Sequence, residues 1–185
     1  MAKRDKDTIT LGSGKVYLKE YTNTVPATKK DLDDLCVAAN ELGHIKGGAS
    51  LEYTQDTYEE KDDLGIVSKI ITTDEEVLLK LGTLTWNGNT LKSLLDRCTV
   101  SEASGLRTTK IGGAGNAQGK YYVVCFHYSD AVDGDLWVVI VGRNTAGATI
   151  TFAKDAGTVI EPEFKAKPHD TVGTLVEIFE EIDAA

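Results

Sequence analysis

Hydrophobic and polar residues alternate along several stretches of the chain, a pattern typical of β-strands with two different faces. The alternation from Lys15 to Tyr21 predicts an opening strand. The stretch KYYVVCFHY, residues 120–128, also alternates but is largely apolar on both faces, so we expect a central strand there. The continuous apolar run LWVVIVG, residues 136–142, predicts another interior strand. Later strands are expected at Ala148–Phe152, Thr158–Lys165 and Gly173–Ile182.

Two segments show the spacing of helices instead. Apolar residues at 32, 35, 36 and 39 follow Thr28 and Asp31, which are residue types that cap a helix start. Asn87 to Cys98 gives the clearer pattern, because its apolar residues recur at positions i, i+3, i+4 and i+7. We expect this second helix to pack through one face only.

The segment from Gly47 to Trp86 predicts a long hairpin with an acidic centre. Strict alternation assigns one face to polar side chains. That polar face comprises Glu52, Thr54, Asp56 and Tyr58 on the first strand, and Thr72, Asp74, Glu76 and Lys80 on the second. Ile70 and Leu78 break the polar parity, so a bulge is expected to shift it. The tip is assigned to the charged run Glu59, Glu60, Lys61, Asp62, Asp63, Leu64 and Gly65.

Short strands with turns and one clear helix predict a mainly β fold, an antiparallel β-sandwich or half-barrel with a flanking α-helix and a long β-hairpin. At 185 residues the chain fits a single domain. Its expected parts are an amino-terminal arm at 1–14, the hairpin at 47–86, the helix at 87–98 and the remaining strands at 120–182.

Acidic residues outnumber basic ones, 29 against 20, for a formal charge of −9. Such a charge disfavours gripping DNA, because that affinity depends on neutralising phosphates with Lys and Arg. The three cysteines lack C-x-x-C spacing, which argues against a disulfide framework or a structural zinc site. No apolar run suits a membrane span, and the start MAKRDKDTIT lacks the apolar core of a signal peptide, so we expect a cytosolic protein.

Several short motifs resemble functional sites without completing them. GSGK at 12–15 lacks the first glycine of a phosphate loop, and GGAGNAQG at 112–119 precedes a strand instead of a helix, so we interpret both as turns or loops. Cys125 and His127 share a strand face and could form a thiolate–imidazole pair or bind a metal. No motif supplies further partners, so a buried sulfur beside a core or interface histidine is favoured. We therefore expect no enzyme activity, no cofactor and no metal.

The order of these features resembles that of phage tail tube proteins, the major tail proteins of bacteriophages and related tail-like particles. The resemblance covers nearly the whole chain. It is carried by GKVYLKEY, by LGHIKGGASLEYTQDTYEEKDDLG leading into IITTDEEVLLKLGTLTWN, by the leucine-striped helix and by FKAKPHDTVGTLVEIFEE. It implies a β-sandwich that assembles into stacked hexameric rings, with the hairpins forming a closed barrel around a lumen through which DNA passes without specific binding.

The resemblance also implies roles for particular residues. The lumen candidates are Glu52, Thr54, Asp56, Thr72, Glu76 and Lys80. The ring-stacking loop would be Glu59 to Gly65, with a second ring-to-ring contact at about Ala2 to Thr10. Implied partners are further copies of the chain, a tape-measure protein, and tail completion or baseplate proteins, with no membrane. The implied location is the virion tail, after assembly in the bacterial host cytoplasm.

An alternative from another class is an extracellular β-sandwich module that binds carbohydrate. Such a module needs an exposed aromatic platform and a secretion signal. Only Trp86 and Trp137 offer large indole surfaces, and both lie within apolar strand-like runs. A small hydrolase is a third possibility, but no nucleophile–base pairing supports it.

Overall fold

The structure is a computed structural model and describes residue 4, residues 8–10 and residues 12–183. Within these residues the chain is mainly β and its strands pair antiparallel, which confirms the predicted class. The strands are β1 (Lys15–Glu20), β2 (Glu41–Gly43), β3 (Ile45–Lys61), β4 (Ser68–Thr83), β5 (Cys98–Ala103), β6 (Leu106–Ile111), β7 (Tyr122–Tyr128), β8 (Leu136–Asn144), β9 (Glu163–Ala166) and β10 (Val176–Glu180). The helices are α1 (Lys29–Leu35), α2 (Gly88–Leu94) and the short 3₁₀ turns η1 (Ala38–Asn40) and η2 (Ala114–Asn116).

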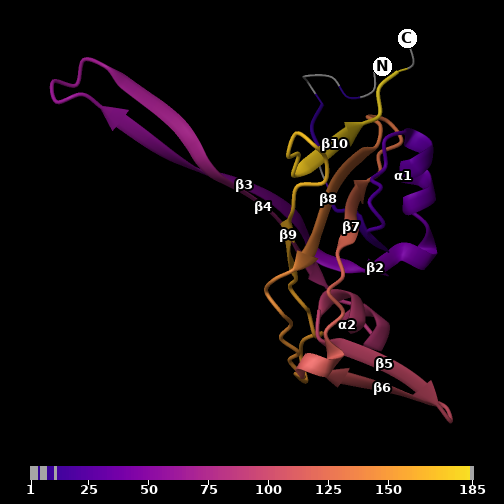
Figure 1. Ribbon diagram of the computed structural model, residues 1–185. Helices are drawn as coiled ribbons and strands as arrows, with labels where there is room; N and C mark the ends of the chain where they lie inside the picture. Colours follow the sequence, from indigo (N-terminus) through magenta and orange to yellow (C-terminus); the bar gives the residue numbers. More distant parts are fainter. Residues whose placement is uncertain (1–3, 5–7, 11, 184–185) are drawn as a thin grey trace.

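Eight strands form one sheet in the order β2-β1-β7-β8-β9-β4-β3, with β10 also paired to β8. Strand β8 organises this sheet because it has neighbours along both edges. It pairs with β7 on one side, while β10 and β9 pair with its first and last parts on the other. Strands β3 and β4 run out of this body as a long projecting hairpin (Figure 1), and β5 and β6 form a separate two-stranded hairpin.

The two helices cover opposite faces of the sheet. On the face that we call the α1 face, Leu32 and Leu35 pack against Val123, Cys125 and Val139. The opposite α2 face carries the larger core, in which Leu91 and Leu94 of α2 are buried with side chains from seven strands, among them Val16, Val124, Ile140, Phe164 and Leu79. Because burying one such side chain contributes about 1.5–3 kcal/mol, these clusters hold the body together.

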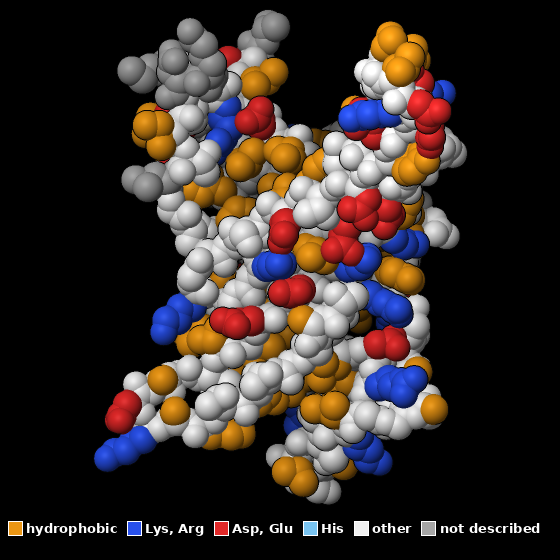
Figure 2. All heavy atoms as spheres, turned by 90° about the vertical axis from the view of Figure 1, so that its left-hand side faces the viewer, with side chains coloured by type: hydrophobic (Ala, Val, Ile, Leu, Met, Phe, Trp, Pro, Cys, Tyr) orange, Lys and Arg blue, Asp and Glu red, His pale blue; other side chains and the backbone are white. Residues whose placement is uncertain are grey.

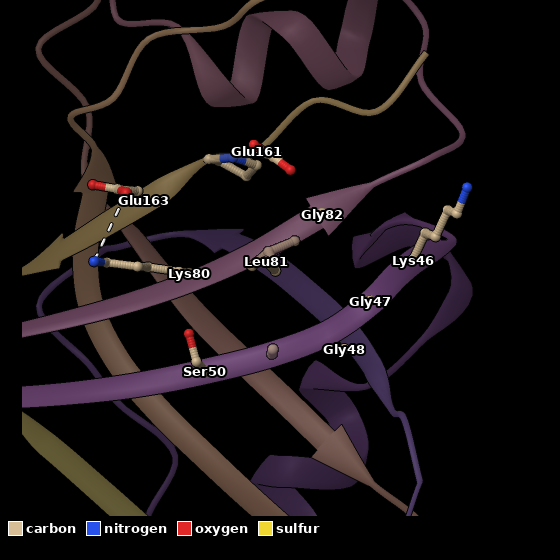
Figure 3. A pocket seen from close by; sticks show the side chains of 11 residues that line it. Lys46, Gly47, Gly48, Ser50, Lys80, Leu81, Gly82, Glu161 and Glu163 are labelled. Atoms are coloured by element: carbon tan, nitrogen blue, oxygen red, sulfur yellow. Dashed lines mark ion pairs between the residues drawn. The ribbon is translucent and has the colours of Figure 1, made fainter. Parts of the chain in front are cut away.

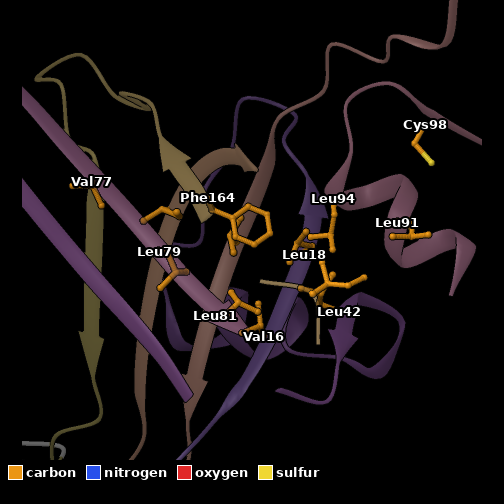
Figure 4. Close-up of a cluster of buried hydrophobic side chains, with 13 residues drawn as sticks. Val16, Leu18, Leu42, Val77, Leu79, Leu81, Leu91, Leu94, Cys98 and Phe164 are labelled. Carbon is orange, nitrogen blue, oxygen red and sulfur yellow. The ribbon is translucent and has the colours of Figure 1, made fainter. Parts of the chain in front are cut away.

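Strand β4 connects this core to the hairpin. Its Val77, Leu79 and Leu81 alternate onto the α2 face and are each at most 5% exposed. Figure 4 shows them beside Phe164 of β9, which is fully buried. The predicted apolar parity of β4 is therefore correct near its base, and this packing anchors one strand of the hairpin firmly in the body.

Both predicted helix starts are capped as the sequence indicates. Thr28 and Asp31 form a reciprocal capping box at α1, and the Asn87 side chain accepts hydrogen bonds from the first amides of α2. The second helix is shorter than expected. It ends at Leu94, and Cys98 already begins β5.

The later strands need three corrections. Residues 148–152 form no strand, β9 covers only the end of the expected 158–165 segment, and β10 is the centre of the expected 173–182 segment. The β5–β6 hairpin was not predicted. Its turn residues Ser104 and Gly105 both adopt positive φ, and a Ser-Gly pair is a turn signal in a sequence.

The predicted arm at 1–14, and the contact expected at Ala2 to Thr10, lie partly outside the described residues. Of that arm, Arg4 is held at the turn between β7 and β8. Its backbone N–H donates to Asp133 O over 2.9 Å, and its Nε donates to Gly134 O over 3.0 Å. The role of the arm in ring stacking stays a prediction.

Candidate assembly surface on the long hairpin

The β3–β4 hairpin extends well beyond the core that anchors it. Past the Tyr53–Val77 pair, β3 continues for eight residues to Lys61, a length of about 27 Å at the usual rise of a strand. Every residue from Ser50 to Glu75 is exposed. An isolated two-stranded hairpin is marginally stable in water, so this length of strand pair is a poor element for a lone subunit.

Both edges of the projecting hairpin are open. Strand β3 ends the order of the sheet, so its outer edge has no neighbouring strand in the described chain. Strand β4 pairs on its outer side with β9 only at Leu78, Leu79 and Lys80. From Leu78 toward the tip, the backbone groups of β4 on that side have no partner strand among the described residues. Unpaired strand edges are templates for pairing with another chain.

A bulge in β4 changes which side chains share a face. Asp56 lies opposite Asp74, but the next pair is Thr57 with Thr72, so Thr73 is an extra residue in β4. The Thr73 hydroxyl donates to Asp56 O over 3.2 Å. Because residues directly opposite each other point to the same side, Thr72 joins the face of Thr57 and not that of Asp56.

The polar face therefore keeps five of the six lumen candidates. Glu52, Thr54, Asp56, Glu76 and Lys80 share the α1 face, whereas Thr72 belongs to the opposite face and its assignment by parity was wrong. The bulge also moves Ile71 onto the polar side, opposite Tyr58, and Ile70 onto the other side, opposite Glu59. The sequence indicated such a shift, because Ile70 broke the polar alternation.

Ion pairs link the polar face of the hairpin to β9. Lys80 Nζ lies 2.7 Å from Glu52 Oε2 and 3.9 Å from Glu163 Oε1, and Lys165 of β9 pairs with Glu76. Hydrogen bonding to Glu52 raises the pKa of Lys80. Figure 2, which views the molecule from the hairpin side, shows acidic and basic side chains intermixed across its middle. These lysines neutralise acidic groups close to the body.

Negative charge dominates further out. Eight acidic and two basic side chains lie between Ser50 and Glu75, so this segment has a formal charge of −6 out of −9 for the chain. Asp56 and Asp74 take part in none of the ion pairs formed among the described residues. The unbalanced acidity of the chain thus lies mainly on the part that projects.

The tip differs from the predicted charged loop. Glu59, Glu60 and Lys61 still belong to β3 and pair with β4, and the connection is residues 62–67. Asp62 closes it, because its backbone carbonyl accepts from Gly65 N over 2.9 Å and its Oδ1 accepts from Val67 N over 2.7 Å. The hydrogen bond from the Val67 amide to the carboxylate lowers the pKa of Asp62.

Three large apolar side chains stand out at this tip. Leu64 is 80% exposed, Ile66 is 77% exposed and Val67 is 67% exposed. Figure 2 shows hydrophobic side chains gathered at the end of the projecting column at the upper right. Charge was the signal used to place the loop, so Ile66 and Val67, which follow Gly65, were missed. Exposed apolar residues grouped in this way are typical of a contact surface.

Two glycines shape the base of the hairpin. Between the Ile45–Thr83 and Ala49–Leu81 pairs, three residues of β3 face the single Gly82 of β4. Gly47 and Gly48 occupy this bulge with φ of 86° and 79°. Beside it is an open hollow of about 340 Å³, in which Lys80 and Glu163 point toward each other (Figure 3). No His or Cys lines the hollow, so nothing there would activate the Ser50 hydroxyl as the base of a catalytic pair does, and we interpret it as the bend where the hairpin leaves the body.

The other candidates from the sequence are placed as follows. Cys125 is fully buried, and His127 lies beside Asp135. Trp137 is 2% exposed and Trp86 packs against the core, so neither forms the aromatic platform of a carbohydrate module. In the described part of the chain, no three His, Cys, Asp or Glu side chains are grouped to hold a metal. Similarly, none of the described helices is long and apolar enough to cross a membrane.

Comparisons with known proteins do not assign the chain to a family. No protein-family model matches the sequence, and a search of curated proteins finds no match.

Proposed function

We propose that this chain is the self-assembling structural subunit of a tube of the phage-tail kind, in which the hairpins of neighbouring copies join edge to edge around an acidic lumen. The observation that carries the proposal is that every residue from 50 to 75 is exposed on a hairpin with two open edges. The resemblance in sequence order points to the same class of protein.

The two open edges are complementary in a way that favours a ring. One copy can place its β3 against the outer edge of β4 in the next copy. Since β3 and β4 run in opposite directions, every strand contact around such a ring is antiparallel. A head-to-tail contact of this type closes into a ring when the rotation between copies permits it, and the closed barrel then has no free edges. The resemblance suggests six copies per ring.

The two faces of the hairpin suit the inside and the outside of such a barrel. Glu52, Thr54 and Asp56 would face the lumen, where acidic groups repel a phosphate backbone and let DNA pass without capture. Leu51 and Tyr53 lie on the opposite face, which continues directly onto the buried Val77 and Leu79. That face would turn outward against the bodies of the subunits.

Stacking of rings would use the apolar tip. Leu64, Ile66 and Val67 would insert against a neighbouring ring, whereas the loop expected from the sequence, Glu59 to Gly65, was mainly charged and contained only Leu64 of these three. Burial of three such side chains contributes several kcal/mol per subunit, before the entropic cost of ordering the tip is subtracted. Every copy in the tube repeats this contribution. A tape-measure protein inside the lumen and completion proteins at the ends are the further partners that this role requires.

The test is assembly of the purified full chain, followed by light scattering over a concentration series and by negative-stain microscopy. We expect rings or tubes from the wild type. The triple variant Leu64→Ser, Ile66→Ser and Val67→Ser should stay folded but form no stacked tubes. Leu106→Ser is the matched control, because Leu106 is 68% exposed at the turn end of the other hairpin. A wild-type chain that stays monomeric at all concentrations would reject the proposal.

A further inference from the structure

Two cysteines that are far apart in the sequence meet beneath α1. Cys36, the residue that caps the end of α1, has its Sγ 3.8 Å from the Sγ of Cys125 on β7. Cys125 is fully buried, whereas Cys36 is partly exposed at the edge of the helix. One sulfur is therefore open to a small reagent and the other is shielded behind it.

A histidine and a carboxylate complete this cluster. His127 lies two residues beyond Cys125 on the same strand face, and its Nε2 is 3.0 Å from Asp135 Oδ2. The imidazole stacks on Trp137 with 4.9 Å between ring centroids and an angle of 5°. Asp135 Oδ1 accepts hydrogen bonds from the Ser129 hydroxyl and the Asp130 amide. The histidine is thus fixed in orientation by groups on both sides.

The electrostatics of the cluster distinguish the two thiols. The neighbouring Cys125 thiol, followed by His127, lowers the pKa of Cys36 to about 6 in spite of its burial. The pKa of Cys125 is raised, by its contact with Cys36 and by burial. Burial lowers the pKa of His127, but contacts with Cys36 and Asp135 outweigh this and leave it raised. The direction of these shifts favours the thiolate form of Cys36, the charged form of His127 and the protonated form of Cys125.

Several other groups surround the Cys36 sulfur. Tyr17 of β1 interacts with Cys36 and Cys125, and Asp33 of α1 opposes ionisation of Cys36. Lys29 of α1 lies over the Trp137 ring, 4.9 Å from its centroid. Reactive cysteines in proteins occur in such partly exposed surroundings, next to a positively charged group.

We propose that Cys36 and Cys125 are a peroxide-oxidised dithiol, with Cys36 as the reacting thiolate, Cys125 as the resolving thiol and His127 as the positioning residue. This site does not depend on the proposed role in a tube. It is also separate from the hairpin, because it lies beneath α1 on the other half of the sheet.

The chemistry balances in two steps. The Cys36 thiolate attacks one oxygen of hydrogen peroxide, the O–O bond breaks, and the departing hydroxide takes a proton to leave as water, giving Cys36–SOH. Cys125 then loses its proton and attacks the Cys36 sulfur. The S–S bond forms, the S–O bond breaks and a second water leaves. Two electrons pass from the two thiols to the peroxide. A thiol reductant reverses the reaction.

The third cysteine supplies an internal control. Cys98 is fully buried, and burial raises its pKa. It lies where α2 meets β5, in the core on the opposite face of the sheet from Cys125. Peroxide should therefore leave Cys98 reduced while Cys36 and Cys125 react.

The first experiment treats the full-length reduced protein with hydrogen peroxide, blocks the remaining thiols with an alkylating reagent and maps peptides by mass spectrometry. We expect a linked Cys36–Cys125 peptide pair, with loss of two hydrogen atoms, and an alkylated Cys98. Cys98→Ser should behave like the wild type, and Cys125→Ser should instead accumulate a sulfenic acid at Cys36 that a dione reagent captures. A link through Cys98, a link between two copies, or three free thiols after treatment would overturn the proposal.

The second experiment measures how fast iodoacetamide alkylates Cys36 at pH 6. At that pH about half of Cys36 is thiolate, against about 0.1% of a thiol of pKa 9. The lower nucleophilicity of an acidic thiolate cancels part of this advantage, so a roughly 20-fold faster reaction is expected than for an ordinary thiol. His127→Gln should remove part of this acceleration at pH 6, because the Cys125 thiol is the larger cause of the lowered pKa and His127 the next. Equal alkylation rates for His127→Gln and the wild type would remove His127 from the proposal. If Cys36 of the wild type reacts no faster than an ordinary thiol, the proposal is overturned.

Discussion

Asp56 of β3 and Asp74 of β4 lie directly opposite each other, at the last pair before the bulge. Like charges in this position destabilise a strand pair by a few tenths of a kcal/mol to about 1 kcal/mol. Asp74→Asn should therefore slow backbone amide exchange in the outer half of the hairpin of the isolated subunit. Glu75→Gln is the matched control, since Glu75 lies opposite the neutral Gln55 and the Gln amide oxygen can still accept the hydrogen bond that Glu75 accepts from the Tyr53 hydroxyl, so exchange should change little. Unchanged protection in Asp74→Asn would mean that the repulsion is already screened by solvent.

The glycine pair at the base of the hairpin allows a test of backbone strain without a steric clash. An added Cβ at Gly47 would meet no atom within 4 Å, but its φ of 86° is unfavourable for other residues. Gly47→Ala should lower the free energy of unfolding by about 1–2 kcal/mol in urea titrations. Gly115→Ala is the control, because that site is equally open and its φ is not positive. An equal loss in both variants would attribute the effect to something other than the bulge.

Charge reversal on the polar face tests the lumen assignment, and the structure selects the residue. Glu52 and Glu76 pair with lysines, so reversing them would also break contacts to the body. Asp56→Lys avoids this problem. Assembled tubes of Asp56→Lys should retain duplex DNA at low salt and release it as salt rises, because each captured phosphate contributes about 0.9 to the slope of log affinity against log salt. Gln55→Lys, on the opposite face, should behave like the wild type. If only Gln55→Lys retains DNA, the face of the hairpin that carries Gln55 lines the lumen, and the face that carries Asp56 does not.

Periodicity was enough to predict the strands that carry a buried face. β1 and the two long strands of the hairpin show alternation, because a single buried face selects apolar residues at every second position. β7 and β8 are apolar on both faces, which is typical of strands in the interior of a sheet. Residues 148–152 show the same alternation without forming a strand, and Phe152 is 83% exposed, so this segment has no continuous buried face. The β5–β6 hairpin has few apolar positions, and only its Ser104–Gly105 turn signalled it.

The candidate surface was predictable in outline, and its details depended on single residues. One extra residue, Thr73, moves Thr72 to the other face, and alternation alone does not show where such a bulge falls. Charge misplaced the tip, because exposed strands tolerate charged side chains as readily as turns do. The contact of Cys36 with Cys125 joins residues 89 positions apart, and no local pattern encodes such a distance.

The Asp135 carboxylate should make the free energy of unfolding depend on pH in the acidic range. Burial opposes its ionisation, but hydrogen bonds from His127 and Ser129 prevail and lower its pKa. The ionised form therefore stabilises the folded state above the unfolded pKa of about 3.8, and this contribution is lost as the pH falls through the lower folded pKa. Asp135→Asn should unfold more easily than the wild type at pH 6, and the difference should shrink below pH 4. Asp63→Asn, at the exposed tip, should show no such convergence; a constant difference for Asp135→Asn would assign its effect to lost packing.

Oxidation of Cys36 and Cys125 to a disulfide should raise the stability of the folded chain. A Cys36–Cys125 disulfide would close a loop of 89 positions, and restricting the unfolded chain in this way is typically worth about 2–4 kcal/mol. For a domain of this size that corresponds to a rise of roughly 5–15 °C in the melting temperature. The rise should appear after peroxide treatment, disappear on addition of a thiol reductant, and be absent in Cys36→Ser and Cys125→Ser. Because α1 is the element tied down, amide exchange at the end of this helix should slow more than exchange in the distant β5–β6 hairpin. A bond that forms but lowers the melting temperature would show that closing the gap between the two sulfurs strains α1 by more than the loop constraint contributes.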